Sequence, residues 1–340
     1  MFRLRARVVS HVVRGNRSLA VAVGCILMTA LSLSAQESTV FHANVNLVHV
    51  IATVRNKAGD LVGALGKDDF GISDNGVPQE IAIFSKQTDQ PLSVALLIDV
   101  SGSTAKDLKF EIDSASRFLR ALLAEGNLED RVALYSFDDT VRVVHSYTHN
   151  FAAIDSALKK VGGSAGTSLY DAIYLTAHDL ELRQGRKVMV IISDGGNTTS
   201  RYDTHQALEA AQMADTVIYP VIVMPVTSTA GRNIGGENAL KFMADGTGGR
   251  TFLPSLGKQL DKAFDDIVTE LRTEYVMGFY PRNVPLPKEP FHRLEVTVKR
   301  PELQVSARNG YYGESEPRPS NPDARISVKP DTGDVRKKKH

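Results

Sequence analysis

The sequence has very little cysteine, no tryptophan and no excess of either charge. Its single cysteine, Cys25, excludes a disulfide framework, a cysteine-rich zinc site and a CxxC redox pair. The 40 Lys and Arg against 39 Asp and Glu leave a formal charge of +1, so the strong positive field of a nucleic-acid-binding protein is not expected. The content of 42% hydrophobic and 23% charged residues over 340 positions is that of a globular protein, which excludes wholesale disorder and a multi-span membrane protein.

Residues 1–35 have the pattern of a targeting segment. Five arginines occur there without an acidic residue, and the apolar run Leu19–Leu33 and the small residues Ser34 and Ala35 follow. This order is typical of a cleaved signal peptide, and the run is shorter than the ~20 residues of a spanning helix. An uncleaved anchor and a lipoprotein processed at Cys25 are the alternatives, although the apolar run continues past the cysteine.

Cleavage after residue 35 would change both charge and cysteine content. It removes five arginines, so the charge becomes 1 − 5 = −4, and it removes the only cysteine. We therefore expect an exported protein that can enter an oxidising compartment without forming disulfides. The sequence does not distinguish the periplasm, the outer surface and the extracellular space, and membrane contact is expected only through an uncleaved signal segment.

Residues 91–272 predict an α/β domain because apolar strands alternate with amphipathic helices. The expected architecture is a doubly wound, mostly parallel sheet with Val141–Tyr147 as an antiparallel edge strand. The other predicted strands are Ser93–Asp99, Arg131–Phe137, Lys187–Ser193, Thr216–Met224 and Arg250–Leu253. The predicted helices are Lys109–Ala124, Phe151–Val161, Leu169–Leu182, Thr204–Ala214, Glu237–Asp245 and about Leu256–Leu271.

The flanking residues 36–90 and 273–313 predict short strands, and residues 314–340 predict a disordered tail. Asn75-Gly76 lies between the strands Phe70–Asp74 and Val77–Phe84, a strong hairpin signal. Each flank is too small for a good core, but together they approach the ~100 residues of a β-sandwich. We expect one sandwich with the α/β domain inserted between its halves; two separate β extensions are the alternative. The further predicted strands are Val40–Val54, Tyr275–Tyr280, His292–Lys299, Gln304–Ala307 and Tyr311–Tyr312.

Oxygen-bearing side chains follow three of the predicted strands and helices. Asp99, Ser101 and Ser103 come directly after the first strand of the α/β domain. The alternating directions of the predicted strands and helices place two further residues at the same edge of the sheet. These are Thr167, in a glycine-rich loop, and Asp194, after a buried strand. Carboxylates and hydroxyls are hard ligands suited to Mg²⁺ or Mn²⁺, and Ca²⁺ is also compatible. The alternative is that the first three residues cap the next helix.

This set resembles the von Willebrand factor type A domain and its metal-ion-dependent adhesion site, whose pattern is DxSxS, then a Thr, then an Asp. All five residues of that pattern are present, and the resemblance covers roughly residues 91–272. Together with Val45–Val50, Asp74–Gly76 and Tyr275–Pro281, the chain looks like the exported von Willebrand factor A-related proteins of Acidobacteria. The resemblance implies a non-enzymatic module that binds a protein or matrix partner, through an Asp or Glu carboxylate of the partner, at a divalent cation.

Several interpretations remain beside this one. In one alternative, the chain is a structural or accessory subunit of a larger envelope complex, and the cation does no more than stabilise the fold. Asp138 and Asp139 lie on the same rim, where they either raise the affinity for metal or solvate a turn. A GxSxG string surrounds Ser164, but a predicted helix precedes it where a serine hydrolase needs a strand. No general base with recognisable spacing accompanies the cluster, so we expect no enzyme.

Overall fold

The computed structural model describes residues 47–86, 90–104, 107–124, 126–223 and 233–315. The described residues belong to one compact unit, Asn46–His340. Two predicted segments lie outside the described residues: the signal segment 1–35, which contains Cys25, and residues 316–340 of the tail. Among the described residues, no helix has the length and apolar character needed to cross a membrane.

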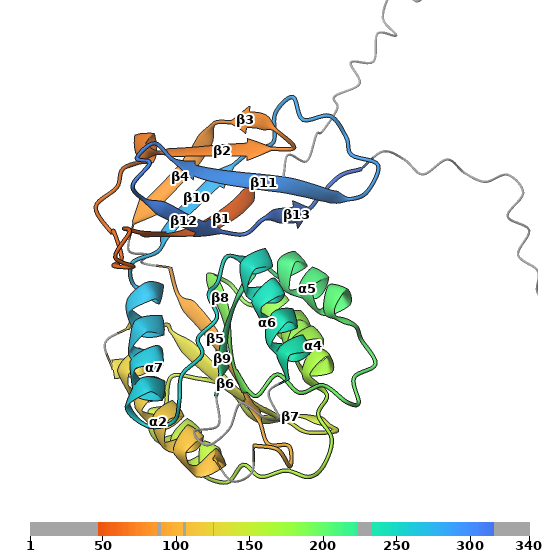
Figure 1. Ribbon diagram of the computed structural model, residues 1–340. Helices are drawn as coiled ribbons and strands as arrows, with labels where there is room; N and C mark the ends of the chain where they lie inside the picture. The colour runs from red at the N-terminus through yellow and green to blue at the C-terminus, as the bar shows by residue number, and fades with distance from the viewer. Residues whose placement is uncertain (1–46, 87–89, 105–106, 125, 224–232, 316–340) are drawn as a thin grey trace, which may run out of the picture. The chain divides into compact units, whose positions relative to one another are not determined.

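A five-stranded sheet forms the centre of the α/β domain, in the order β7-β6-β5-β8-β9 (Figure 1). Its strands are β5 (Leu92–Asp99), β6 (Arg131–Phe137), β7 (Val141–Thr148), β8 (Arg186–Ser193) and β9 (Thr216–Ile222). Neighbouring strands run parallel except β7, which is antiparallel to β6. Every residue of β5 is buried, as expected for a parallel strand covered on both faces. The predicted α/β fold with an antiparallel edge strand is confirmed.

Helices cover both faces of this sheet (Figure 1). One face packs against α2, α3 and α7, where the Phe118 and Phe264 rings stack with centroids 5.0 Å apart. The other face packs against α4, α5 and α6. The helices are α2 (Leu108–Ala124), α3 (Phe151–Leu158), α4 (Leu169–Glu181), α5 (Thr204–Met213), α6 (Ile234–Thr247) and α7 (Lys258–Leu271).

The predicted strand Arg250–Leu253 is wrong. Only Phe252 pairs with the sheet, through a single parallel bridge to Val221. Its N–H donates to the Pro220 carbonyl and its carbonyl accepts from the Ile222 N–H, at 2.8 Å each. Pro254 follows two residues later and has no N–H with which a ladder could continue.

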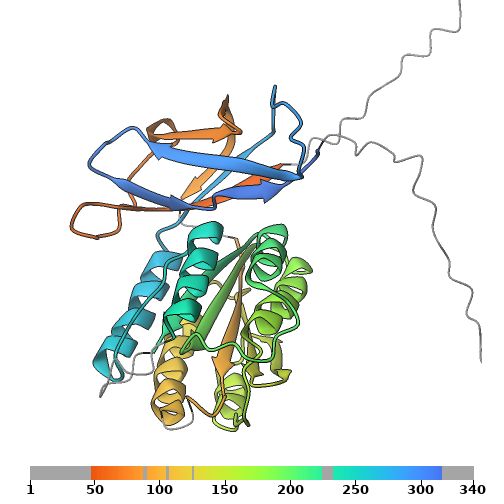
Figure 2. The same ribbon diagram turned by 45° about the vertical axis from the view of Figure 1, so that its right-hand side comes forward.

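The two flanks pair with each other in two four-stranded sheets, β12-β1-β10-β4 and β13-β11-β2-β3. Figure 2 shows orange strands of the N-terminal flank beside blue strands of the C-terminal flank. One buried cluster contains apolar residues of both sheets, so the sheets form a β-sandwich. The strands are β1 (Val48–Arg55), β2 (Phe70–Asp74), β3 (Val77–Gln79), β4 (Ile81–Lys86), β10 (Tyr275–Phe279), β11 (Phe291–Val298), β12 (Gln304–Ala307) and β13 (Gly310–Tyr312), and a short 3-10 turn, η1 (Lys67–Asp69), precedes β2.

The predicted strand Val77–Phe84 is in fact two strands that belong to different sheets. The chain changes sheet at Glu80, between β3 and β4. The buried Gln79 fixes this crossing, because its amide donates to the Arg282 carbonyl at 3.1 Å and accepts from the Arg282 N–H at 2.9 Å. The domain boundaries predicted from the sequence stay predictions.

Candidate metal centre

Asp99 ends β5 and is fully buried. The Ser101 N–H donates to Asp99 Oδ1 at 3.0 Å, and the Ser193 hydroxyl at the end of β8 donates to Asp99 Oδ2 at 2.7 Å. Burial raises the pKa of Asp99, hydrogen bonds from Ser101 and Ser193 oppose this, and the Asp194 charge raises it further. The carboxylate is thus held in place by neutral donors, with a second negative charge near it.

The two serine hydroxyls that follow Asp99 lie side by side, with Ser101 Oγ 3.1 Å from Ser103 Oγ. Ser101 is buried and Ser103 is exposed, so the pair leads from the sheet edge to solvent. The Thr104 hydroxyl donates to the Asp99 carbonyl at 3.0 Å and closes the turn. At the start of α2, the Leu108 N–H donates to the Thr104 carbonyl at 3.0 Å.

The loop that carries Thr167 rests directly on the Asp99 loop. An ideal Cβ placed on Gly163 would lie only 2.1 Å from the Val100 carbonyl oxygen, so only glycine fits this approach. Thr167 is buried, and its carbonyl accepts from the N–H groups of Thr198 and Thr199 at 2.8 and 3.1 Å. The loops after α3, β5 and β8 are therefore in contact with one another.

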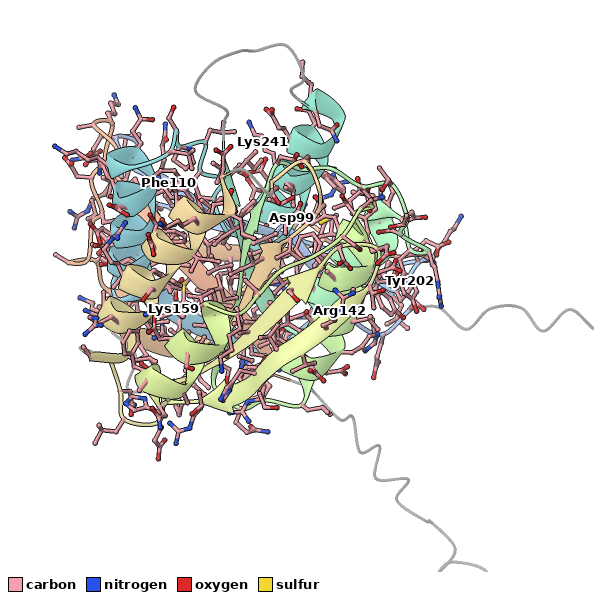
Figure 3. All side chains as sticks on the ribbon, turned by 90° about the horizontal axis from the view of Figure 1, so that it is seen from below. Asp99, Phe110, Arg142, Lys159, Tyr202 and Lys241 are labelled. Carbon is pink, nitrogen blue, oxygen red and sulfur yellow. The ribbon has the colours of Figure 1, made fainter. Side chains whose placement is uncertain are left out.

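Asp194 and Thr167 face the same small space beside Gly196. The Gly196 N–H donates to Asp194 Oδ1 at 2.8 Å. A Cβ on Gly196 would lie 2.9 Å from Asp194 Oδ1 and 3.7 Å from Thr167 Oγ1. Asp194 also interacts electrostatically with Asp99. The structure thus brings the Thr167 and Asp194 oxygens together, near Asp99 at the end of β5, which is labelled in Figure 3.

The two predicted rim residues differ in their contacts. Asp138 is fully buried, and its carboxylate accepts from Arg142, from the Thr140 N–H and from both the N–H and the hydroxyl of Ser164. Burial favours a higher pKa for Asp138, but these hydrogen bonds outweigh it and lower the pKa to about 2. The side chain joins the β6–β7 turn to the glycine-rich loop. Asp139 is exposed and accepts from the Thr140 hydroxyl at 3.1 Å, which favours a turn role.

Glu111 in the first turn of α2 is a functional candidate that the sequence analysis missed. It is 1% exposed, and its Oε2 has no hydrogen-bond partner among the described residues. Burial and the nearby carboxylates of Asp99, Asp107 and Asp194 raise the pKa of Glu111 to about 8. Its spacing was the available signal: Glu111 falls on the helical face of Ala115, one turn along the chain, where an apolar residue is expected.

The donor set of the centre consists of two carboxylates and three hydroxyls, which are hard oxygen ligands. Among the described residues, no group of three or more His, Cys, Asp or Glu side chains is arranged to hold a metal ion. The predicted centre does not require such a group, because three of its five ligands are hydroxyls. The residues present therefore fit a divalent cation by their chemistry, and the assignment of the site stays a prediction.

Comparisons with known proteins support the resemblance in the central part of the chain. Residues 94–197 match the family model of the von Willebrand factor type A domain. This range includes all five predicted ligands. The match supports a von Willebrand factor type A domain in this chain. Among the curated proteins, the search with this chain found no match.

Solved structures of low sequence identity also match. The conserved hypothetical protein BatB of Bacteroides thetaiotaomicron is 17% identical, with a TM-score of 0.43, and the match covers 53% of this chain and 97% of that one. The vWF domain of the type V pili tip protein Mfa5 of Porphyromonas gingivalis is 16% identical, with a TM-score of 0.45 and coverage of 54% and 95%. A von Willebrand factor type A structure from Catenulispora acidiphila is 11% identical, with a TM-score of 0.45 and 73% coverage of each chain.

Proposed function

We propose that the chain is an exported, non-enzymatic binding module that engages a protein or matrix partner through a divalent cation. The family supports the general role, because von Willebrand factor type A domains are typically protein-interaction modules. Residues 1–35 support export by their signal-like pattern. The proposed ligands of the cation are Asp99, Ser101, Ser103, Thr167 and Asp194.

The observation that carries this proposal is the meeting of three loops at one edge of the sheet. The Ser101 and Ser103 hydroxyl oxygens lie 3.1 Å apart, and the Thr167 and Asp194 oxygens share the space beside Gly196. Mg²⁺ prefers six ligands and usually keeps several waters, and Mn²⁺ suits the same oxygens. The exposed side of Ser103 gives solvent, and a carboxylate of a partner, access to such an ion.

The charges of the five residues suit recognition of an acidic group. Asp99 and Asp194 provide two formal negative charges, while the three hydroxyl ligands are neutral. These two charges formally balance a divalent ion, so the attraction for a further carboxylate would come from an open coordination position, and it is greater where one Asp acts through water. The protein's own residues hold and orient the ion, and the ion supplies the positive charge to which a partner's Asp or Glu binds.

The test is an array of peptides that each contain one Asp or Glu, with matched peptides that contain Asn or Gln instead. We expect the full chain to bind a subset of the acidic peptides with Mg²⁺ or Mn²⁺, and to release them in EDTA. Asp99→Asn should abolish this binding without loss of fold, whereas Asp113→Asn on the exposed face of α2 should not. Binding that persists in EDTA or in Asp99→Asn would refute a cation-bridged contact.

A fold-stabilising cation gives a different result. In that case Mg²⁺ raises the melting temperature and Asp99→Asn removes the rise, but no acidic peptide binds under any condition. The two outcomes separate the proposed binding module from a structural subunit in which the metal only supports the fold.

A further inference from the structure

The carboxyl group of Glu111 is buried, and it forms no ion pair with another described residue. The residue is 1% exposed, and Oε2 has no hydrogen-bond partner in the described part of the chain. Burying an ionised carboxylate in this way is unfavourable because the charge loses its hydration. The position of Glu111 near the N-terminus of α2 offsets only a small part of that cost. The helix dipole therefore does not account for a buried acid here.

The surroundings of Glu111 add to this cost. Its neighbours Asp99, Asp107 and Asp194 all repel its charge. Asp107 lies one helical turn before Glu111, whereas Asp99 and Asp194 follow the ends of β5 and β8. Glu111 thus lies close enough to the two carboxylates of the candidate metal centre for their charges to act on it, and a positive ion held by those carboxylates would relieve the repulsion.

We propose that Glu111 is an additional carboxylate of the cation site, which it approaches from the buried side and supports through ion-bound water. This inference rests on the proposed function and adds to it a residue that sets the affinity for the ion. Contact through water is favoured because no three acidic, His or Cys side chains among the described residues are arranged to bind one ion directly. Water is also the ligand that Mg²⁺ most readily keeps.

Glu111 is therefore a positioning residue rather than a direct ligand. An ionised Glu111 accepts a hydrogen bond from water on the ion and fixes the orientation of that water. Its negative charge adds to those of Asp99 and Asp194 and attracts the ion through that water, which reduces part of the ion's attraction for a partner's carboxylate. Removal of such an outer partner in metal proteins typically lowers metal affinity 10–100-fold.

The test is isothermal titration calorimetry of the full chain with Mg²⁺ and with Mn²⁺. Glu111→Gln keeps the shape and removes the charge, and Asp113→Asn removes a charge from the exposed face of the same helix. We expect Glu111→Gln to weaken binding about 10–100-fold, and Asp113→Asn to bind like the wild type. Glu111→Asp, which keeps the charge on a shorter side chain, should bind more tightly than Glu111→Gln.

A melting curve in EDTA separates this role from a merely structural one. Without the cation, Glu111→Gln should melt at or above the temperature of the wild type, because the amide replaces a buried acid whose charged form is unfavourable there. A Glu111→Gln protein that is unfolded in EDTA, or that binds Mg²⁺ with wild-type affinity, overturns the inference.

The Asp99→Asn variant distinguishes failure of the inference from failure of the proposed function. If Asp99→Asn loses the ion while Glu111→Gln retains it fully, the inference fails alone and the proposed ligands stand. If the wild type binds neither ion, both fail together.

Discussion

The contact between the glycine-rich loop and the Asp99 loop predicts a large difference between two adjacent glycines. An ideal Cβ on Gly163 would lie 2.1 Å from the Val100 carbonyl oxygen and 2.5 Å from Val100 Cγ2. A Cβ on Gly162 would meet no atom within 4 Å. Gly163→Ala must therefore push the two loops apart, whereas Gly162→Ala places its methyl group in open space.

The expected magnitude follows from the cost of overpacking, which is typically about 1–3 kcal/mol. In a domain of about 150–250 residues, the size range of the predicted α/β domain 91–272, 1 kcal/mol changes Tm by roughly 2–4 °C, so Gly163→Ala should lower Tm by about 2–12 °C. Thr167 lies four residues further along the displaced loop, so the Mg²⁺-induced rise in Tm should also shrink. In the wild type, Mg²⁺ at a concentration of 100 Kd is expected to raise the free energy of unfolding by about 2.7 kcal/mol.

The assay is thermal unfolding, monitored by circular dichroism, in EDTA and in Mg²⁺. Gly162→Ala is the matched control and should stay close to the wild type in both conditions. Equal melting temperatures and equal Mg²⁺ responses for the two variants would refute the contact between the loops as the basis of the centre.

Further predictions concern stability and are checked by chemical denaturation. The pKa of Asp138 in the folded state is lowered to about 2, so the ionised carboxylate stabilises the fold above about pH 4, and this stabilisation is lost as the pH falls toward 2. Asp138→Asn should therefore lower the free energy of unfolding by about 2 kcal/mol at pH 7, and by less in acid. Leu96→Ala, in the fully buried β5, should cost about 2–5 kcal/mol, whereas Leu128→Ala, at 81% exposure, should cost less than about 0.5 kcal/mol. The Tyr275 hydroxyl accepts from the Leu65 N–H at 3.0 Å, so Tyr275→Phe should cost about 1–3 kcal/mol because a buried donor loses its partner. Each contact has a result that would contradict it. These results are a cost of Asp138→Asn that is the same in acid as at pH 7, equal costs for the two leucine variants, and an unchanged free energy of unfolding in Tyr275→Phe.

The α/β domain could be predicted from the sequence because its strands are buried on both faces and read as continuous apolar runs. Once the strand directions were set, Asp99 and Asp194 had to follow the carboxyl ends of parallel strands at one edge of the sheet. The apolar residues of Val77–Phe84 do not indicate that this segment forms two strands in different sheets. The division at Glu80 depends on the Gln79 amide, which bonds to a residue 203 positions away.

Two features of the site could be predicted only in part from the sequence. The spacing of Glu111 with Ala115 places it on the apolar face of its helix, but an acid in an amphipathic helix is usually solvated, and the packing of α2 establishes that this one is buried. Asp138 was one of two acids in a turn, and its partner Ser164 lies 26 residues away. A sequence pattern indicates which residues share an edge of the sheet, but not which carboxylate is used to join two loops.

The most direct test of the cation site is a crystal structure of the protein grown with Mn²⁺, with the ion located by its anomalous scattering. We expect one strong peak where the three loops meet, within bonding distance of the Ser101 and Ser103 hydroxyls and near Asp99, Thr167 and Asp194. Crystals of Asp99→Asn should lack that peak. A peak elsewhere on the chain, or an ion retained at this place by Asp99→Asn, would contradict the assignment of the centre.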